Sequence, residues 1–324
     1  MDEILVKAQR NVLIDALKGL GILFMIFGHA QLPPVLQQPI CLFHMPLFFL
    51  ISGYLYKNKG LFLTTKHSLR KIIIPYLFTG FVIWIILIIQ KGEYDWGISL
   101  LFGNAYKTLS WNQSYTVGPL WFLMSFFSAQ LLYSIIFKIK HEEKRFLICI
   151  VLFEISIILK HFYNMLPLGI LPAMSGILFM QIGQSLRTKK HFYICHKKIL
   201  CLFGVIAYII CLFKGNLAMS WHIYDLNLLL FVSATFVTIL CYLLLKRWGG
   251  HYYKLNKLGY YSLPLMCIHA VDRKIGITIS LTQFITDNNF LLGVFDFVLK
   301  IIFVILIFKL IKKIKFFKTI YSIK

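Results

Sequence analysis

The chain has 324 residues, of which 59% are hydrophobic and only 14% charged, and its mean hydropathy is +0.77. About a quarter of the residues in a soluble globular domain are charged, so this composition excludes an ordinary soluble protein. The net charge of +22 does not indicate nucleic-acid binding, because the basic residues lie in short clusters between long apolar segments. We therefore expect a protein that contacts membrane lipids and no nucleic acid.

The apolar segments have the length of membrane-spanning helices, which need about 20 apolar residues to cross a ~30 Å hydrocarbon layer. Most of them lack the polar stripe of a soluble amphipathic helix. We predict an all-α, polytopic bundle that forms one membrane domain over residues 1–324. Its ten predicted spans cover residues 12–30, 42–56, 72–90, 118–137, 145–160, 168–186, 198–213, 226–245, 257–271 and 291–311.

Lysine and arginine are concentrated in every second connection between these spans. This alternation is typical of cytoplasmic loops, so both termini are predicted to be cytoplasmic. The tail, residues 309–324, alternates lysine with isoleucine and phenylalanine; we predict either an amphipathic segment along the inner headgroups or a simple basic anchor for the last span. The cytoplasmic basic residues begin with Lys7 and Arg10 and include Lys57, Lys59, Lys66, Arg70, Lys71, Lys138, Lys140, Lys144 and Arg145.

Seven cysteines are scattered along the chain without a CxxC pair, and most fall in or near predicted spans, where cysteine behaves as a small apolar residue. We expect no disulfide framework and no metal site from Cys41, Cys149, Cys195, Cys201, Cys211, Cys241 and Cys267.

The first predicted span contains three ionisable residues, Asp15, Lys18 and His29. Such residues are costly inside a membrane and usually face a protein-lined or wet cavity. At 100° per residue, Lys18 and His29 fall within about 20° of each other on a helix, and about 16 Å apart along its axis. One interpretation is a polar face that runs through the depth of the span. The other is an ion pair between Lys18 and Asp15, with His29 as an interfacial polar cap.

Two further histidines support the first interpretation. His44 begins the second span, after a short loop that makes the first two spans antiparallel neighbours, so it is predicted to lie near the level of His29. His269 lies near the outer end of the ninth span. Three histidines at one depth favour a functional site over three separate structural roles.

These motifs together resemble the membrane acyltransferase-3 family, and in particular its fucose 4-O-acetylase-like branch. The opening block of that family has a basic residue and a histidine separated by ten residues, as Lys18 and His29 are here. The resemblance covers nearly the whole chain, and further blocks in the family's order are Phe43-His44-Met45-Pro46-Leu47-Phe48-Phe49, Ser52-Gly53-Tyr54-Leu55, Arg70-Lys71 with Ile74-Pro75-Tyr76, Gly118-Pro119-Leu120-Trp121-Phe122-Leu123, and Tyr261-Ser262-Leu263 through His269.

The sequence departs from the family pattern at two places. Lys18 stands where many members have arginine, and a lysine lacks the bidentate fork of a guanidinium, so its phosphate contacts differ. The block that ends Trp121-Phe122-Leu123-Met124-Ser125 lacks the acidic residue that the O-antigen acetylase branch carries nearby.

The resemblance implies a multi-pass protein of the bacterial cytoplasmic membrane that moves an acyl group from a cytoplasmic acyl-CoA, usually acetyl-CoA, to a sugar of a surface polysaccharide. Acyl-CoA is then a donor substrate, and no permanently bound cofactor is expected. We expect Lys18, Arg70 and Lys71 to hold the donor phosphates, although Arg70 and Lys71 also suit a simple topological role. A neutral imidazole can accept a hydroxyl proton, so His29 is the predicted general base.

The remaining predicted roles concern the oxyanion and the acceptor. His44 or His269 is expected to stabilise the developing oxyanion or to orient the acceptor, a glycan or lipid-linked sugar. Transfer is either direct or by way of an acyl-enzyme on His29 or Ser52. Ser52 with Gly53 also suits tight helix packing. Asp15, Ser52, Trp121 and Trp221 are the predicted substrate-binding residues.

Two predicted outer segments, 91–117 and 214–225, are rich in aromatic residues. Aromatic rings can stack on sugars, but they also form the interfacial belts of ordinary membrane proteins. The residues concerned are Tyr94, Trp96, Tyr106, Trp111, Tyr115, Trp221 and Tyr224.

Other functions compete with this prediction. The acceptor could be an amine or a lipid head group, and the acyl group could be succinyl. A transporter or flippase for a polyprenyl-linked glycan would also need buried charges in a multispan bundle. The chain shows no repeated pair of broken helices, which transporters often have.

Overall fold

The computed structural model describes residues 11–105, 116–163, 166–248, 252–283 and 289–323. Several residues singled out above lie outside this part of the chain: Lys7, Arg10, Tyr106, Trp111 and Tyr115.

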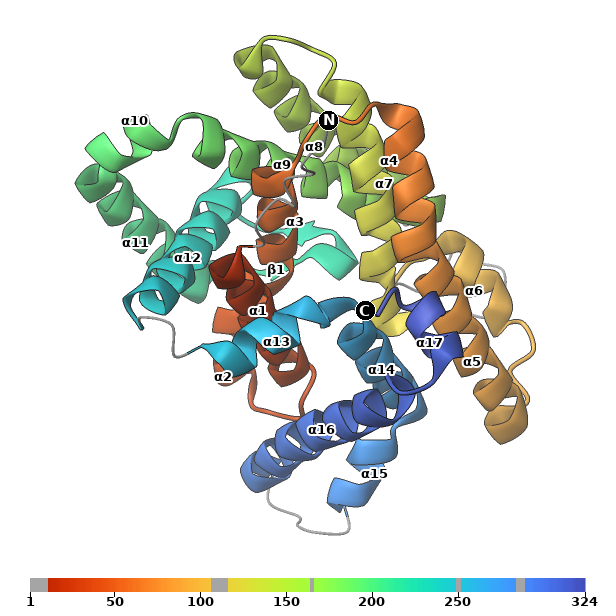
Figure 1. Cartoon of the computed structure of the whole chain (residues 1–324). Coiled ribbons are helices and arrows are strands. Elements are labelled where there is room, and N and C mark those ends of the chain that lie inside the picture. The colour runs from red at the N-terminus through yellow and green to blue at the C-terminus, as the bar shows by residue number, and fades with distance from the viewer. Residues whose placement is uncertain (1–10, 106–115, 164–165, 249–251, 284–288, 324) are drawn as a thin grey trace, which may run out of the picture.

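The first half of the chain is a series of helices (Figure 1). The first, α1, begins where the Asn11 side chain accepts hydrogen bonds from the backbone N–H groups of Leu13 and Ile14, at 3.1 and 3.2 Å. Such a side chain satisfies amides that the first helical turn leaves unpaired. The helices are α1 (Val12–Gly28), α2 (Pro34–Cys41), α3 (His44–Leu55), α4 (Leu61–Ser68), α5 (Ile74–Lys91), α6 (Trp96–Phe102), α7 (Trp121–Ile136) and α8 (Glu142–Phe162), with a π-helical turn at Leu69–Ile73 and a 3-10 turn at Gly118–Leu120.

The second half continues the bundle and includes one small hairpin. Its two strands, β1 (Leu217–Ala218) and β2 (Ile223–Tyr224), are antiparallel and pair Leu217 with Tyr224. The helices are α9 (Ile170–Thr188), α10 (Lys190–Cys195), α11 (Lys197–Lys214), α12 (Leu228–Arg247), α13 (Tyr253–Tyr260), α14 (Ser262–Ile275), α15 (Ile277–Gln283), α16 (Asn289–Ile311) and α17 (Lys315–Ile320), and 3-10 turns lie at Pro167–Gly169 and Met219–Trp221.

This architecture is that of an all-helical, polytopic membrane protein. Every predicted span coincides with a helix in the described residues. Six helical segments there are long and apolar enough to cross a bilayer: Pro34–Leu55, Leu61–Lys91, Gly118–Ile136, Pro167–Thr188, Leu228–Arg247 and Phe290–Ile311. The other four predicted spans correspond to α1, α8, α11 and α14, which are shorter or carry charged ends.

The predicted span 257–271 differs from the structure in one respect. The helix breaks at Tyr261, so that α13 ends at Tyr260 and α14 begins at Ser262. Pro264 has no N–H to bond the carbonyl of Tyr260, so the sequence cannot continue a regular helix through this point. The break leaves α13 free to lie across α1, while α14 enters the core.

Glycines bring two pairs of helices into backbone contact. A side chain at Gly19 would overlap the carbonyl of Leu255, and one at Gly259 would overlap the carbonyl of Asp15, which fixes α1 against α13. Gly53 meets the carbonyl of Met180 in the same way, which fixes α3 against α9. Small residues permit such close packing of membrane helices.

The tail returns to the bundle and packs on α5, beside which α17 lies in Figure 1. The Phe78 ring of α5 contacts the rings of Phe316 and Phe317, with centroids 5.5 and 5.9 Å apart. Lys315 and Lys318 of α17 are exposed. The segment is therefore amphipathic, and its apolar side is only partly covered by protein, since Phe316 remains 55% exposed.

Candidate active site

The histidines of α1 and α14 form a direct pair. His29 is the residue at which α1 ends, and His269 lies within α14. The Nδ1 atom of His29 is 3.0 Å from the Nε2 atom of His269, and the two rings are stacked with centroids 5.1 Å apart and planes 21° apart. One nitrogen must carry the proton that joins them. His269 is fully buried, whereas His29 is half-buried, so His29 is the member that a substrate can reach.

His44, the first residue of α3, lies beside Gly28 at the end of α1. A side chain added at Gly28 would contact its Cε1 atom at 3.9 Å and the Cys41 sulfur at 3.7 Å. The Nδ1 atom of His44 is 2.9 Å from the carbonyl oxygen of Ile40. Because a carbonyl can only accept, Nδ1 carries the proton and the lone pair of the neutral ring is on Nε2.

A cavity of about 480 Å³ lies toward the opposite end of the same helices, and none of these three histidines is among the residues that line it. Lys18 and Ile22 line it from α1, and Ser262 and Met266 line it from α14. These positions lie on successive turns below His29 and His269, since residues three or four apart share one helix face. The cavity wall therefore lies on the faces of α1 and α14 that carry His29 and His269, and it includes the apolar Ile22 and Met266.

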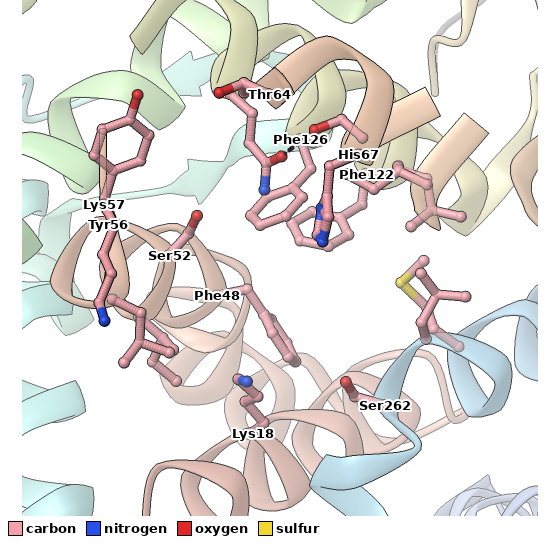
Figure 2. A pocket seen from close by; sticks show the side chains of 18 of the residues that line it. Lys18, Phe48, Ser52, Tyr56, Lys57, Thr64, His67, Phe122, Phe126 and Ser262 are labelled. Carbon is pink, nitrogen blue, oxygen red and sulfur yellow. Dashed lines mark hydrogen bonds between the residues drawn. The ribbon is translucent and has the colours of Figure 1, made fainter. Parts of the chain in front are cut away.

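The walls of this cavity are basic and polar at the mouth and apolar in depth. Figure 2 shows Lys18 and Ser262 facing His67 and Phe126 across open space, with Ser52 and Tyr56 on a third side. The mouth also includes Lys57 and Lys59, which follow α3, and Gln130 of α7. The depth is lined by Ile22, Phe48, Phe122 and Met266. Such a cavity suits an elongated ligand with an anionic end.

The sequence model of the acyltransferase-3 family, described as an acyltransferase domain, matches residues 11–311. The chain belongs to the acyltransferase-3 family. Membership implies an acyltransferase activity, and the match covers every residue of the histidine group and of the 480 Å³ cavity. No curated protein and no solved structure gave a match.

The cationic residues predicted to hold the donor are separated in this acyltransferase-3 structure. Lys18 lines the cavity, with its Nζ atom 3.4 Å from the buried carboxylate of Asp15, so the predicted ion pair is present. Lys71 lines a second cavity, described below. Arg70 is exposed and is not among the lining residues of either cavity.

The predicted substrate-binding residues do not form one group. Ser52 lines the cavity, about 12 Å along the α3 axis from His44. Trp121 is buried in the core, with its ring against that of Phe122. Trp221 is exposed in the connection between β1 and β2, and its carbonyl accepts a hydrogen bond from Lys160 at 2.7 Å. Asp15 is buried beside Lys18.

A buried charged network that the sequence analysis missed adjoins the histidine pair. Lys300 of α16 contacts the carboxylate of Asp296 and donates to Thr278 Oγ1 at 3.0 Å. Thr278 in turn donates to Asp272, three residues after His269, at 2.9 Å. Asp296 also accepts the backbone N–H of Gln31, two residues after His29, at 3.1 Å. The network thus ties the chain beyond both histidines to α16.

The sequence does contain a pattern that indicates this charged network. An aspartate and a lysine four residues apart inside the apolar span 291–311 lie on one helix face, and ionisable residues inside a span indicate a function. Lys300, Asp296 and Asp272 are each no more than 1% exposed.

Proposed function

We propose that this protein moves an acyl group, acetyl in the first instance, from a cytoplasmic acyl-CoA to a hydroxyl of a sugar in an exported or cell-surface glycan. The observation that carries the proposal is the continuous face on α1 and α14, with Lys18 and the cavity at one end and the His29–His269 pair at the other. It suits a donor that enters as an anion and presents its thioester to an imidazole.

His29 is the general base in this proposal. Its Nδ1–H donates to His269, which leaves the lone pair on Nε2 to accept the proton of the acceptor hydroxyl. The hydroxyl oxygen attacks the thioester carbonyl, the new C–O bond forms as the C–S bond breaks, and the leaving CoA sulfur takes the proton from the imidazolium. The products are an ester and free CoA.

Lys18 is proposed to hold the phosphates of the donor at the mouth of the cavity, as a charge already oriented by Asp15. Its Nζ atom carries up to three donors, which suit phosphate oxygens. The helical rise places His29 about 16 Å beyond Lys18, a separation that an extended pantetheine arm spans.

His44 is proposed to orient the acceptor. Since its Nδ1–H is used by Ile40, the neutral ring offers only an acceptor at Nε2 and binds a hydroxyl rather than an oxyanion. Ser52 is too far from the histidines to act as the nucleophile, so we propose direct transfer. Its place in the cavity wall, next to the closely packed Gly53, supports a contact with the donor.

The proposal is tested with purified protein in detergent, acetyl-CoA and a glycan preparation as acceptor, by measuring free CoA thiol and acetylated product together. We expect turnover in the wild type and a loss of about 10²–10⁴-fold in His29→Ala, the range for a general base. His161→Ala, a change at an exposed histidine outside the site, is the matched control and should keep full turnover.

Two outcomes would contradict the proposal. Product without dependence on His29 would remove the assigned base. A glycan transporter or flippase, the competing function, would release no CoA in either protein. Acetylation of an amine or a lipid head group, with normal dependence on His29, would correct the acceptor only.

A further inference from the structure

A second cavity adjoins the first at the cytoplasmic end proposed for the donor. Its volume is about 370 Å³, within the range of ligand sites. The two cavities share six lining residues, so they are two arms of one space: His67, Ile72, Phe126, Gln130, Ser262 and Leu263. Lys18, Ile22 and Met266 line the first arm and not the second.

The end of the chain forms one wall of this second arm. Tyr321, Ser322 and Ile323 line it, together with Lys71 and Tyr261 from the bundle. The tail residues come from the segment after α17, which neither the family match at 11–311 nor the ten predicted spans include.

The tail is fixed in this position by specific contacts. The Tyr321 hydroxyl is 3.0 Å from Thr79 Oγ1, inside the bundle. Its ring lies edge-on to Phe78, with centroids 6.1 Å apart, and Tyr321 and Ile323 are both buried. Ser322 has φ +51°, a left-handed conformation that serine seldom adopts and that surrounding contacts must maintain. A tail that served only as a basic anchor would need none of these contacts.

The chemistry of the second arm suits a nucleotide. Lys71 supplies a positive charge, His67 adds a polar ring, and Ser322 adds a hydroxyl, which together can bind a phosphate. Tyrosine rings offer a flat surface for a purine. The first arm lies on the faces of α1 and α14 that carry His29 and His269 and can take the thioester-bearing part of the donor. The other end of the same molecule must then lie elsewhere.

We propose that the second arm binds the nucleotide end of the acyl-CoA donor, and that the C-terminal tail completes this subsite through Tyr321 and Ser322. The inference rests on the proposed function, because it needs a CoA thioester in the first arm. The tail is thereby a component of the binding site.

The test compares two donors, acetyl-CoA and acetyl-pantetheine, which lacks the nucleotide. We expect Lys71→Ala, and a chain shortened after Lys318, to raise the KM for acetyl-CoA about tenfold, with kcat retained. The KM for acetyl-pantetheine should be the same in all proteins. Lys66→Ala is the matched control: it removes a nearby lysine charge, which is exposed and lines neither arm, and should leave both KM values unchanged.

Binding of adenosine 3′,5′-bisphosphate, measured by calorimetry, needs no turnover. We expect it to bind the wild type and Lys66→Ala, and to bind Lys71→Ala about tenfold more weakly. An equal rise of KM for both donors, or equal binding of the bisphosphate to all variants, would overturn the subsite. A wild type that binds the bisphosphate but transfers no acetyl group would instead sink the proposed function and leave a nucleotide site in place.

Discussion

His29 Nδ1 and His269 Nε2 are 3.0 Å apart, although 240 residues separate them in the chain. The contact joins the end of α1 to the middle of α14. Because a hydrogen bond between two neutral imidazoles needs one donor and one acceptor, it also fixes which nitrogen of His29 remains available. If His29 donates, its Nε2 is the free base and His269 carries its proton on Nδ1, a buried atom with no hydrogen-bond partner among the described residues.

This relationship makes His269 a positioning residue. We expect His269→Ala to lower kcat about 10²-fold, since His29 loses the acceptor that fixes its tautomer and ring orientation. His269→Gln should recover part of the loss, because the amide oxygen can accept from Nδ1. The measurement is kcat for acetyl transfer, with circular dichroism to check the helix content. Equal loss in both variants would contradict the role.

His44 is expected to act on the acceptor rather than the donor. His44→Ala should raise the KM for the glycan acceptor about tenfold, the value of one lost hydrogen bond to a substrate hydroxyl, and leave the KM for acetyl-CoA unchanged. Initial rates with each substrate varied in turn separate the two constants. A rise in the KM for acetyl-CoA alone would contradict the role of His44 in binding the acceptor.

Lys18 should contribute mainly to donor binding. We expect Lys18→Ala to raise the KM for acetyl-CoA at least tenfold with kcat little changed, and Lys18→Arg to keep the donor affinity, because a guanidinium also binds phosphate. Varying the donor concentration at saturating acceptor measures this. A normal donor KM in Lys18→Ala would remove Lys18 from the site.

The Asp296–Lys300 pair should stabilise the packing of α16 against α14 and α15. Removing one member leaves a buried charge uncompensated, so Lys300→Met should cost about 3–5 kcal/mol in the free energy of unfolding. The double change Asp296→Asn with Lys300→Met should cost less than the sum of the single changes. Lys309→Met, an exposed lysine of the same helix, is the control. Thermal unfolding in detergent compares them, and additivity of the two changes would show that the pair is not coupled.

Acid should destabilise the β1–β2 hairpin through His222. Burial, with the nearby Lys160 charge as a smaller cause, lowers the pKa of His222 to about 3. Its Nε2 lies 2.9 Å from Ser156 Oγ, whose own proton goes to the Phe153 carbonyl at 2.6 Å, so Nε2 is the protonated nitrogen and further protonation would charge the buried Nδ1.

The unfolded chain binds a proton at this histidine below about pH 6.5, and the folded chain does so only near pH 3. The contribution of His222 to stability is therefore complete above pH 6.5 and falls by about 1.4 kcal/mol for each pH unit below it. Melting temperatures of the wild type and His222→Gln between pH 7 and 4.5 measure the effect. Identical slopes in the two proteins would rule it out.

The sequence was sufficient for the helical class, the approximate spans and the depth of the three histidines, because hydropathy and helix periodicity are local properties. It also predicted that Lys18 and His29 share a face. It could not show that His269 meets His29 directly while His44 bonds Ile40, since these contacts depend on how α14 and α3 pack against α1.

Other features were beyond local patterns. Arg70 and Lys71 are neighbours in the π-helical turn at Leu69–Ile73 and are both exposed, yet only Lys71 lines a cavity wall. Trp121 and Trp221 are aromatic residues of the type that stacks on sugars, but Trp121 is enclosed by the core. The return of the tail to Thr79 depends on one hydrogen bond and a few ring contacts, which no periodicity reveals.

The glycine contacts of α1 and α3 limit how the 480 Å³ cavity can change its size. The backbones of these helices already touch α13 and α9, so neither wall can retreat to admit a longer acyl chain. The space for the acyl group of the proposed donor is therefore set by the volumes of Ile22, Phe48 and Met266. Selectivity between acetyl and bulkier acyl groups can accordingly evolve by single side-chain replacements, without rearrangement of the bundle.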